Sequence, residues 1–588
     1  MADVPGYSRK MAQDLAFGPL FSHTSQDTAK VAALVAGRLD LPPNPAWKLP
    51  AEITWYENPF KEPNWVAQFH MLRWLDPLRR LAQKGDASLI DRWLAIAESW
   101  IEKNPPGRGR ANYSWADMIE AARAMTFAFA LPVIEDLRPA HLPTVLASLV
   151  QHGEWLADES HIRTGNHALQ QHQGLLVIGA VLERPEWVEL AVARASAMLE
   201  ATYDDQGLNE EGAVQYHQIN FQWWNSLATR VRIATGDVPD AFERVSKAPV
   251  AMAHATRPDG NYELIGDTEI FSPRNLGHPA IAYVSSAGAE GIPPQDRVAV
   301  FDSGYVYGRS TWGDARTRFG DASFYSLRFG PQNRIHGHAD GMAFTLWAGR
   351  ESLLVDSGKL AYDAKDPHRA HLLSREAHNS LSVQGAEHDR TSAVELLVAE
   401  RSDEVEHFRF ADTGYPGVRL QRDVLVALRW HLAVVVDSFE AEEEVTVHQW
   451  WHLSPEASHR KEDSAVVTRT AENELRFTWP EGAVSPRITR GTNAPVQGWY
   501  SPTWRKLIPT RTIDAPLTGT SGTLATVLTF SAAKAPAEVT VTTEASDEGL
   551  HLRITRGTSE SFSSLLTDIS ATLVRGEHSV ADLAKVLR

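Results

Sequence analysis

The spacing of hydrophobic residues predicts helices in the first half of the chain. In the segment 88–103, apolar side chains recur every three to four residues, from Leu89 through Trp93 to Trp100, and the pattern stops at two consecutive prolines. Such a stripe is typical of an amphipathic helix. Short breaks containing Gly, Pro or Asp separate similar segments at 143–156, 168–182 and 185–201. A series of helical hairpins predicts a solenoid or toroid of paired helices, and the lack of a fixed repeat period argues against a tetratricopeptide-like array.

Beyond residue 295 the pattern changes to short runs of β-branched and aromatic residues bounded by turn residues. These runs predict strands at 323–329, 343–348, 352–355, 380–383, 424–436, 445–453, 474–479, 523–530 and 550–555. Many short strands separated by turn signals are typical of stacked antiparallel sheets. We therefore expect a multidomain α+β chain, with a helical domain at 1–294 and an antiparallel β-sandwich domain at 295–588.

Composition and charge exclude several classes of protein and site. The 588-residue chain has no cysteine, so disulfides, thiolate metal sites and a cysteine nucleophile are excluded. Its formal net charge of −17 argues against non-specific binding of nucleic acid. No apolar run approaches the roughly 20 residues that span a bilayer, and the first residues lack the pattern of a secretory signal. We therefore expect a cytoplasmic protein that binds neither nucleic acid nor membrane.

Two clusters in the helical half contain polar groups suited to a binding site. Thr164-Gly165-Asn166-His167 precedes a predicted helix, so Asn166 either caps that helix or, with His167, donates hydrogen bonds to a bound anion. Gln215-Tyr216-His217 follows a run of acidic residues and precedes further aromatic residues. This second cluster is either an aromatic face packed in the core or part of a site, and the residues alone leave both interpretations open.

Two clusters in the strand-rich half contain imidazole and carboxylate groups. His336, His338 and Asp340 occupy alternate positions, so their side chains point the same way if the segment is extended. Such a stripe is costly to bury without partners, and imidazoles at this spacing suit metal binding, base catalysis or both. Asp356 and His378 each flank a predicted strand. Two histidines with one carboxylate form a common zinc ligand set, although spacing alone does not decide that a metal binds.

Together these motifs resemble those of a known family. The segment 336–378, which contains HGHAD and AHNS, resembles the C-terminal domain of heparinase II/III-like polysaccharide lyases. Asn166-His167 and Tyr216-His217 are similar to that family's toroid-domain sites and occur in the same order. The resemblance implies an N-terminal incomplete (α/α) toroid at 1–294, followed by a C-terminal antiparallel β-sandwich at 295–588. The family includes heparinases and oligoalginate lyases, which share fold and mechanism but not substrate.

The resemblance implies cleavage of a uronic-acid-containing glycan by β-elimination, which leaves an unsaturated uronate end. Asn166 and His167 are similar to the pair that neutralises the C5 carboxylate of the sugar. Tyr216 resembles the catalytic tyrosine and is expected to act as general acid at the C4 oxygen and, depending on the stereochemistry of the uronate, also as base. His336 resembles the histidine of the C-terminal domain that serves as base or as a further carboxylate clamp.

The same resemblance implies a metal ion and several substrate contacts. His338, Asp356 and His378 are similar to the ligands of a structural zinc ion, which would make the loop around His336 rigid. Some alginate-specific relatives use a second tyrosine, but the spacing of Tyr362 differs from that pattern and it is not assigned this role. The acidic chain argues against a heavily sulfated substrate. Trp115 and Arg123 resemble a Trp-to-Arg motif on a substrate-facing helix of the family. The residues expected to contact substrate are Trp115, Arg123, His217, Trp223, Arg334 and Arg375.

Two other functions compete with a lyase. A glycoside hydrolase built on a helical toroid would need two carboxylates, which Asp205, Glu210 and Glu211 offer. A carbohydrate-binding relative without activity would keep the fold, although the intact catalytic motifs argue against it. The sequence leaves the glycan, endo or exo action and the oligomeric state open, with a homodimer among the options.

Overall fold

The computed structural model describes residues 6–18, 21–274, 276–363, 365–532, 538–568 and 570–587. These residues form two compact units that interleave along the chain. The first unit lies within 1–202 and 220–245, and the second lies within 203–219 and 246–588. The boundary expected at 294 stays a prediction, since the second unit also includes segments that precede it. No helix in the described ranges is both long and apolar enough to cross a bilayer.

Helices build the first unit, and the spacing of hydrophobic residues explains them. In the helix at 88–103, the predicted stripe of Leu89, Trp93 and Trp100 is buried, and the Asn104 N–H donates to the Trp100 oxygen at the end. The other predicted helices are confirmed, with ends moved by a few residues. The helices up to residue 235 are α1 (Arg9–Asp14), α2 (Asp27–Val35), α3 (Pro63–Met71), α4 (Asp76–Ala82), α5 (Ser88–Lys103), α6 (Ile119–Leu137), α7 (Leu142–Ala157), α8 (Gly165–Val181), α9 (Pro185–Thr202) and α10 (Val214–Thr235), and strands β1 (Arg38–Leu39) and β2 (Trp47–Lys48) pair antiparallel.

Helix α6 is enclosed by its neighbours. Every residue from Ile119 to Ile134 is buried, which is the pattern of a helix inside a bundle rather than one on a surface. Helix α8 approaches α6 so closely that a Cβ added at Gly174 would lie 2.7 Å from the Cβ of Ala121. This tight contact fixes α8 against α6.

The second unit consists mainly of antiparallel sheets. Its helices are α11 (Glu243–His254), which begins in the first unit, α12 (Pro279–Ser285), α13 (Pro367–Leu372) and α14 (Val580–Val586). A five-stranded sheet has the order β3-β4-β5-β6-β7, from β3 (Val298–Phe301), β4 (Tyr305–Arg309), β5 (Phe324–Arg328), β6 (Phe344–Ala348) and β7 (Glu351–Leu354). A four-stranded sheet has the order β22-β23-β24-β25, from β22 (Val539–Ser546), β23 (Gly549–Arg556), β24 (Glu560–Leu566) and β25 (Ala571–Arg575).

A ten-stranded sheet lies between these two. The strands on its main path are β9 (Glu395–Arg401), β10 (Glu406–Tyr415), β11 (Val418–Ala427), β12 (Leu432–His452), β13 (Ser458–Lys461), β14 (Ala465–Arg469), β15 (Asn473–Thr478) and β21 (Arg511–Ala532). Their order is β13-β14-β15-β21-β12-β11-β10-β9, with β8 (Leu381–Val383) paired to β12 and β16 (Arg487–Arg490) paired to β21. Short hairpins join β17 (Thr492–Asn493) to β18 (Val496–Gln497) and β19 (Trp499–Thr503) to β20 (Lys506–Pro509).

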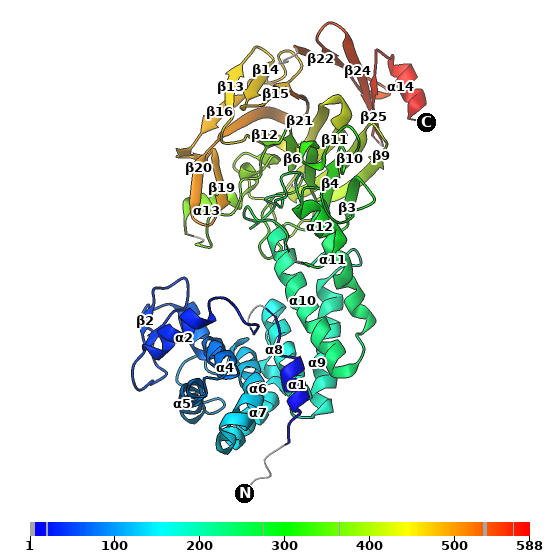
Figure 1. Ribbon diagram of the computed structural model, residues 1–588. Helices are drawn as coiled ribbons and strands as arrows, with labels where there is room; N and C mark the ends of the chain where they lie inside the picture. Colours follow the sequence, from blue (N-terminus) through cyan, green and yellow to red (C-terminus); the bar gives the residue numbers. More distant parts are fainter. Residues whose placement is uncertain are drawn as a thin grey trace. The chain divides into compact units, whose positions relative to one another are not determined.

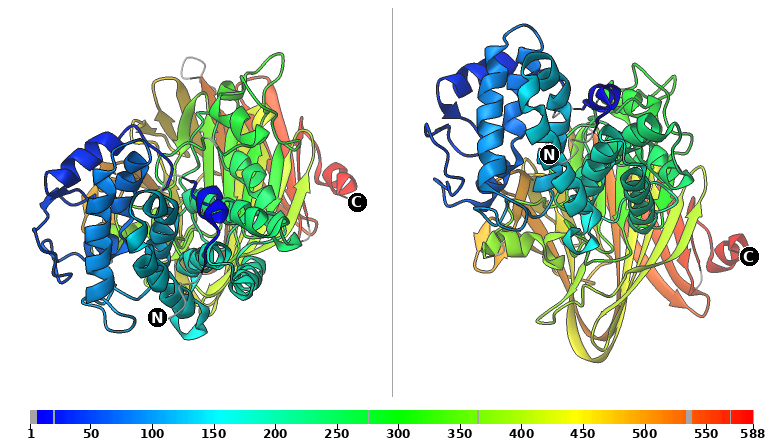
Figure 2. Two further views of the ribbon diagram at one scale, coloured as in Figure 1. Left: turned by 60° about the horizontal axis from the view of Figure 1, so that its bottom comes forward. Right: turned by 90° about the horizontal axis from the view of Figure 1, so that it is seen from below.

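The ten-stranded sheet is apolar on both faces because it is covered on both. Along β11, Val424 and Val426 enter a core shared with the five-stranded sheet, whereas Leu425 and Ala427 enter a core shared with the four-stranded sheet. Alternate side chains of a strand point to opposite faces, so a sheet with two covers needs apolar residues at successive positions. The four-stranded sheet lies beside β11 (Figure 1), with α14 outside it (Figure 2).

This arrangement corrects one strand prediction. The run 424–436 is not one strand, because a 3-10 turn at Leu428–Trp430 divides it into the end of β11 and the start of β12, which pair with Ala427 opposite Leu432. The hydrophobic pattern continues through the turn because both strands are covered on both faces. The fold class is as expected: an N-terminal incomplete (α/α) toroid followed by a C-terminal antiparallel β-sandwich.

Candidate active site

The first turn of α10 places Tyr216 in the second unit. The N–H of Gln215 donates to the hydroxyl of Thr268 at 3.3 Å, and the Gln215 side-chain oxygen accepts from the N–H of Glu269 at 3.1 Å. These bonds tie the start of the helix to the segment 267–269, which has no regular secondary structure. Tyr216 is therefore held beside Asp267.

The segment 334–338 forms a turn rather than a strand. His336 adopts a left-handed backbone conformation with φ of 59°. Asp340 accepts a hydrogen bond from Arg328 at 3.1 Å in the buried interior, so it does not share a face with the histidines. The expected extended stripe of His336, His338 and Asp340 is therefore wrong, because the turn sends Asp340 to a different partner.

Backbone contacts hold this turn in place. The N–H of Gly212 donates to the oxygen of Ile335 at 2.8 Å, and the N–H of Asp267 donates to the oxygen of His336 at 2.9 Å. A Cβ added at Gly266, where φ is +60°, would lie 2.6 Å from the backbone oxygens of both Gly212 and His336. Three stretches of backbone thus meet with no room for a side chain, and this contact sets the position of His336.

His336 and Tyr216 form the centre of the site. Their rings stack with centroids 3.7 Å apart and an interplanar angle of 13°. The Tyr216 hydroxyl is hydrogen-bonded to the hydroxyl of Tyr362, which is 48% exposed and therefore open to a ligand. The Tyr362 ring lies 5.2 Å from that of the exposed Trp504, and Lys359 Nζ lies 5.3 Å from the centre of the Tyr362 ring. The cluster combines two phenols, an imidazole and an aromatic surface of the kind that sugar rings stack on.

Asp267 orients both histidines of the HGH motif. Its carboxylate accepts from His336 Nδ1 and from His338 Nε2, each at 3.1 Å, and from the Arg369 guanidinium at 2.6 and 3.0 Å. Burial alone would raise the pKa of Asp267, but the hydrogen bonds from His336, His338 and Arg369 hold that pKa far below its usual value. Asp267 is therefore a carboxylate, and its contact with Nδ1 directs Nε2 of His336 away from it.

Tyr216 keeps its proton in this environment. Burial, the hydrogen bond to Tyr362 and the charges of Asp267 and Glu211 all raise the pKa of Tyr216 above its usual value. A protonated phenol suits the predicted role of general acid. Glu211 also lies near His336, with Oε2 3.8 Å from Nε2.

The predicted metal ligands lie together. His338, Asp356 and His378 are buried, and one donor atom of each lies within 4.8 Å of the others. His378 Nδ1 is 2.9 Å from Asp356 Oδ2, whereas His338 Nδ1 and His378 Nε2 have no hydrogen-bond partner among the residues described. Buried imidazole nitrogens without partners are costly, and two nitrogens with one carboxylate form a donor set suited to zinc. The residues therefore fit a divalent metal ion.

In the first unit, Asn166 and His167 lie in the first turn of α8. The helix begins at Gly165 and its N-cap residue is Thr164, so the interpretation of Asn166 as the N-cap is wrong. His167 Nδ1 contacts the carboxylate of Asp117, and Asp117 adopts a left-handed backbone conformation. Both predicted side chains are partly exposed, so they are available to a ligand.

The predicted substrate contacts Trp115 and Arg123 are instead part of the core of the first unit. The Arg123 guanidinium is fully buried and lies 3.6 Å from the centre of the Trp100 ring and 5.2 Å from that of Trp115. It donates to His152 Nε2 at 3.0 Å and to the His70 oxygen at 2.9 Å, and burial lowers its pKa to about 9. A side chain enclosed in this way does not reach substrate, so the structure does not support this part of the prediction.

Two further predicted contacts are also internal. His217 is buried, with Nε2 2.9 Å from the backbone oxygen of Glu211, and Arg375 is buried in an ion pair with Asp412. Both stabilise the second unit rather than face solvent. Arg334 and Trp223 are partly exposed, so their substrate contacts stay predictions.

Tyr362 is not among the residues predicted for the site. Its spacing argued against it, yet its hydroxyl bonds to that of Tyr216. Asp267 and Asp117 were missed altogether, because each lies in a segment without periodic pattern or recognisable motif. For Asp267 the signal is chemical, since the buried His338 needs a partner for its second nitrogen.

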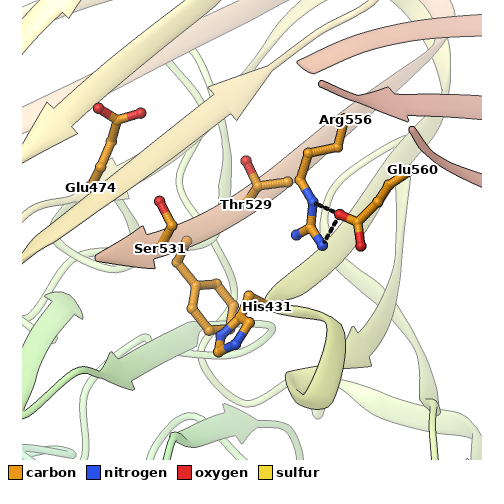
Figure 3. Close-up of a pocket in the computed structure, with 7 residues that line it drawn as sticks. His431, Glu474, Thr529, Ser531, Arg556 and Glu560 are labelled. Carbon is orange, nitrogen blue, oxygen red and sulfur yellow. Dashed lines mark hydrogen bonds and ion pairs between the residues drawn. The ribbon is translucent and has the colours of Figure 1, made fainter. Parts of the chain in front are cut away.

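A separate pocket of about 240 Å³ lies among β15, β21, β23 and β24 (Figure 3). Arg556 and Glu560 form an ion pair at 2.6 Å on one side of it, and Glu474 on the other side pairs with Arg469 at 2.8 Å. Its charges are thus already balanced, and no predicted site residue lines it.

Comparisons with known proteins agree with this architecture. A heparinase II/III N-terminus model matches residues 20–276, and a heparinase II/III-like C-terminal model matches residues 293–543. The structure of heparan sulfate lyase HepC from Pedobacter heparinus has a TM-score of 0.77 at 17% identity, covering 97% of this chain and 93% of that chain. A crystal structure of heparinase III has a TM-score of 0.74 at 18% identity, covering 97% and 94%. Curated protein sequences give no match. The likeness to solved structures is one of fold, and with both family models matched, the chain belongs to the heparinase II/III-like family.

Proposed function

We propose that this protein is a polysaccharide or oligosaccharide lyase that cleaves uronic-acid-containing glycans by β-elimination. The observation that carries the proposal is the stack of His336 on Tyr216, with the Tyr362 hydroxyl and the Asp267 carboxylate beside it. Elimination needs a base and an acid within reach of one sugar ring, and this cluster supplies both. Family membership and the heparan sulfate lyase among the structural neighbours make glycosaminoglycans the first class to test.

The reaction breaks two bonds and forms one double bond. A base removes the C5 proton of the uronate, the electron pair of that bond becomes the C4–C5 double bond, and the C4–O4 bond breaks. The leaving O4 oxygen takes a proton from a general acid. No water is consumed, so one product has a new hydroxyl and the other has an unsaturated uronate end. Negative charge accumulates on the C5 carboxylate during the step, so hydrogen-bond donors aimed there accelerate it.

Tyr216 is the proposed acid. Its raised pKa keeps the proton that O4 must receive, and Tyr362 can return a proton to it through their shared hydrogen bond. His336 is the proposed base, because Asp267 holds Nδ1 and leaves Nε2 for the sugar. For the opposite C5 epimer, the hydrogen lies on the other face of the ring. Tyr216 would then also act as base, for which cationic or hydrogen-bonding neighbours would have to lower its raised pKa, and His336 would act as a carboxylate clamp.

Asn166 and His167 are proposed to donate hydrogen bonds to the uronate carboxylate. His167 suits this role because its contact with the Asp117 carboxylate occupies Nδ1 and leaves Nε2 for a ligand. Asn166 offers amide hydrogens from the first turn of a helix, where the macrodipole also favours a bound anion.

The proposed metal is a structural zinc ion held by His338, Asp356 and His378. Zinc at this position supplies a rigid anchor rather than a reactive centre. Asp267 contacts both His338 and His336, so a fixed His338 would in turn fix the carboxylate that orients the base.

The test is a panel of heparan sulfate, chondroitin, hyaluronan, alginate and glucuronan oligomers, with ultraviolet absorbance of the unsaturated product as readout. We expect absorbance to rise with at least one uronate glycan. In Tyr216→Phe the rate of this rise should be at least ~100-fold lower, which is the smallest effect typical of losing a general acid. Reducing ends that appear without absorbance would instead identify a hydrolase, for which Asp205, Glu210 and Glu211 are the candidate carboxylates. A panel that binds but stays uncleaved would identify an inactive binding protein.

A further inference from the structure

The first unit contains a cavity of about 720 Å³ that the proposed reaction does not use. It lies among α2, β1, the end of α3 and the start of α4, all within residues 24–80. Figure 1 shows α2 and α4 close together in the blue part of the helical region. A cavity of this size is in the range of small-molecule and sugar sites.

The charged residues that line the cavity are mostly basic. Lys30, Arg38, Arg73 and Arg80 line it, and Asp40 is the one acidic residue in its lining. The charge of Arg80 is balanced by buried carboxylates, since its guanidinium binds Asp27 at 2.7 and 2.9 Å and also Asp76. Lys30, Arg38 and Arg73 have no ion pair among the residues described. A basic cavity is unexpected in a chain with a net charge of −17, and it indicates an anionic ligand.

Arg73 is the strongest indication. Its Nε is buried without a hydrogen-bond partner, and no carboxylate is paired with its guanidinium in the part of the chain that the structure describes. Burial lowers the pKa of Arg73 to about 10, so the group stays charged at neutral pH without a counter-charge from the protein. Arg73 as a whole is half-buried, but its Nε is enclosed; leaving this charged donor unpaired is costly, and an anion in the cavity would remove that cost.

Trp74 adds a surface suited to a sugar. Its indole nitrogen already donates to the oxygen of Phe69 at 3.1 Å, and one face lies parallel to the Phe69 ring. What Trp74 presents to the cavity is therefore apolar ring surface. Aromatic surface beside unpaired cations matches a pyranose ring that carries a carboxylate or sulfate group.

We propose that the cavity formed by Lys30, Arg38, Arg73 and Trp74 is a second, non-catalytic binding site for an anionic oligosaccharide chain. Arg73 pairs with a carboxylate or sulfate group of the oligosaccharide, and Trp74 packs on the adjacent sugar ring. Lys30 and Arg38 contact charged groups further along the oligosaccharide. The site holds a polymer while the catalytic residues act elsewhere on it. The identity of the sugar in this proposal rests on the proposed function, whereas the negative charge of the ligand does not.

The experiment measures binding in the full-length Tyr216→Phe background, where substrate is not consumed. Heparan sulfate, hyaluronan and alginate chains are the probes, with neutral dextran and inorganic phosphate as comparisons, and calorimetry is the readout. The test variant is Lys30→Gln with Arg73→Gln. The matched control is Lys84→Gln with Arg232→Gln, which changes the same charges at exposed positions of the first unit that do not line the cavity.

We expect the test variant to bind the anionic chain about tenfold more weakly, while the control binds as before. With Tyr216 intact, the same pair of substitutions should leave kcat on the shortest cleavable oligomer unchanged and raise KM for long chains. Arg73→Lys should recover part of the affinity, and Lys30→Gln alone should weaken binding even if the double variant folds poorly.

Three outcomes would overturn the proposal. The test and control variants could lose affinity equally, dextran could bind as well as the anionic chains, or phosphate alone could occupy the cavity while chains do not. The proposed function fails independently, if no uronate glycan is cleaved, and the binding measurement still decides whether the cavity recognises anionic chains.

Discussion

Replacing Gly266 with alanine tests whether the backbone contact beneath His336 sets the site. Gly266 has φ of +60°, a conformation that costs an alanine about 1–2 kcal/mol. The added Cβ would also lie 2.6 Å from the backbone oxygens of Gly212 and His336, neither of which can rotate away. Overpacking of this kind costs about 1–3 kcal/mol, so Gly266→Ala should lower the free energy of unfolding by about 2–5 kcal/mol in total.

The matched control is Gly385→Ala. Gly385 also has positive φ, of +73°, but a Cβ there would meet nothing within 4 Å. It should therefore lose only the conformational part, about 1–2 kcal/mol. Comparing the two variants separates the strain of the backbone from the clash with the turn.

Urea-induced unfolding and kcat/KM on a cleavable uronate oligomer measure the two consequences. We expect Gly266→Ala to lose stability beyond the control and to lose at least ~100-fold in kcat/KM, because a displacement of about 1 Å in a catalytic group has that effect. Gly385→Ala should keep its activity. Equal losses of stability in the two variants, or full activity in Gly266→Ala, would show that the contact does not position His336.

Three further variants test other parts of the site and fold. His338→Ala should lose about one equivalent of bound zinc per chain, measured by metal analysis of the purified protein, and a wild-type protein that binds no metal would refute the assignment. Burial and the hydrogen bond to Tyr362 raise the pKa of Tyr216, so Tyr362→Phe should lower that pKa and move the basic limb of the kcat/KM profile to lower pH, while an unmoved limb would separate Tyr362 from the acid. Burial raises the pKa of Glu120 from 4.5 to about 7, so the folded state keeps a proton that the unfolded state releases. Glu120 should thus contribute a loss of stability of about 3 kcal/mol as pH rises from about 4.5 to about 7. In urea titrations at a series of pH values, Glu120→Gln should lose this contribution, while that of Glu263, whose pKa burial also raises to about 7, remains.

The sequence predicted the elements well wherever one face of an element meets the core. The helix at 88–103 was found with its exact ends, because its apolar stripe is interrupted on the solvent side and stopped by prolines. The hairpin at 424–436 was read as one strand, since strands covered on both faces lose the alternation that marks their ends. Hydrophobic periodicity marks an element only where one of its faces is exposed, so it does not show the ends of fully buried strands.

The candidate site was predictable in its motifs but not in its supports. His336, His338 and Tyr216 belong to short patterns that a reader can recognise, whereas Asp267 sits in an irregular segment far from them in sequence. The prediction that Arg123 contacts substrate is not supported, because a motif on a helix does not reveal that other helices enclose it. Which side of a helix meets solvent is decided by its neighbours, and these come from distant parts of the chain.

The four-stranded sheet, which covers one face of the ten-stranded sheet, determines where this protein can be divided into fragments. The C-terminal family match ends at residue 543, inside β22, whereas the other three strands of that sheet follow it. A fragment cut at the family limit would leave Leu425, Val434 and their neighbours facing water across a broad apolar surface. Such a surface favours self-association, so insoluble material from that fragment would reflect where it was cut and not how the intact protein behaves.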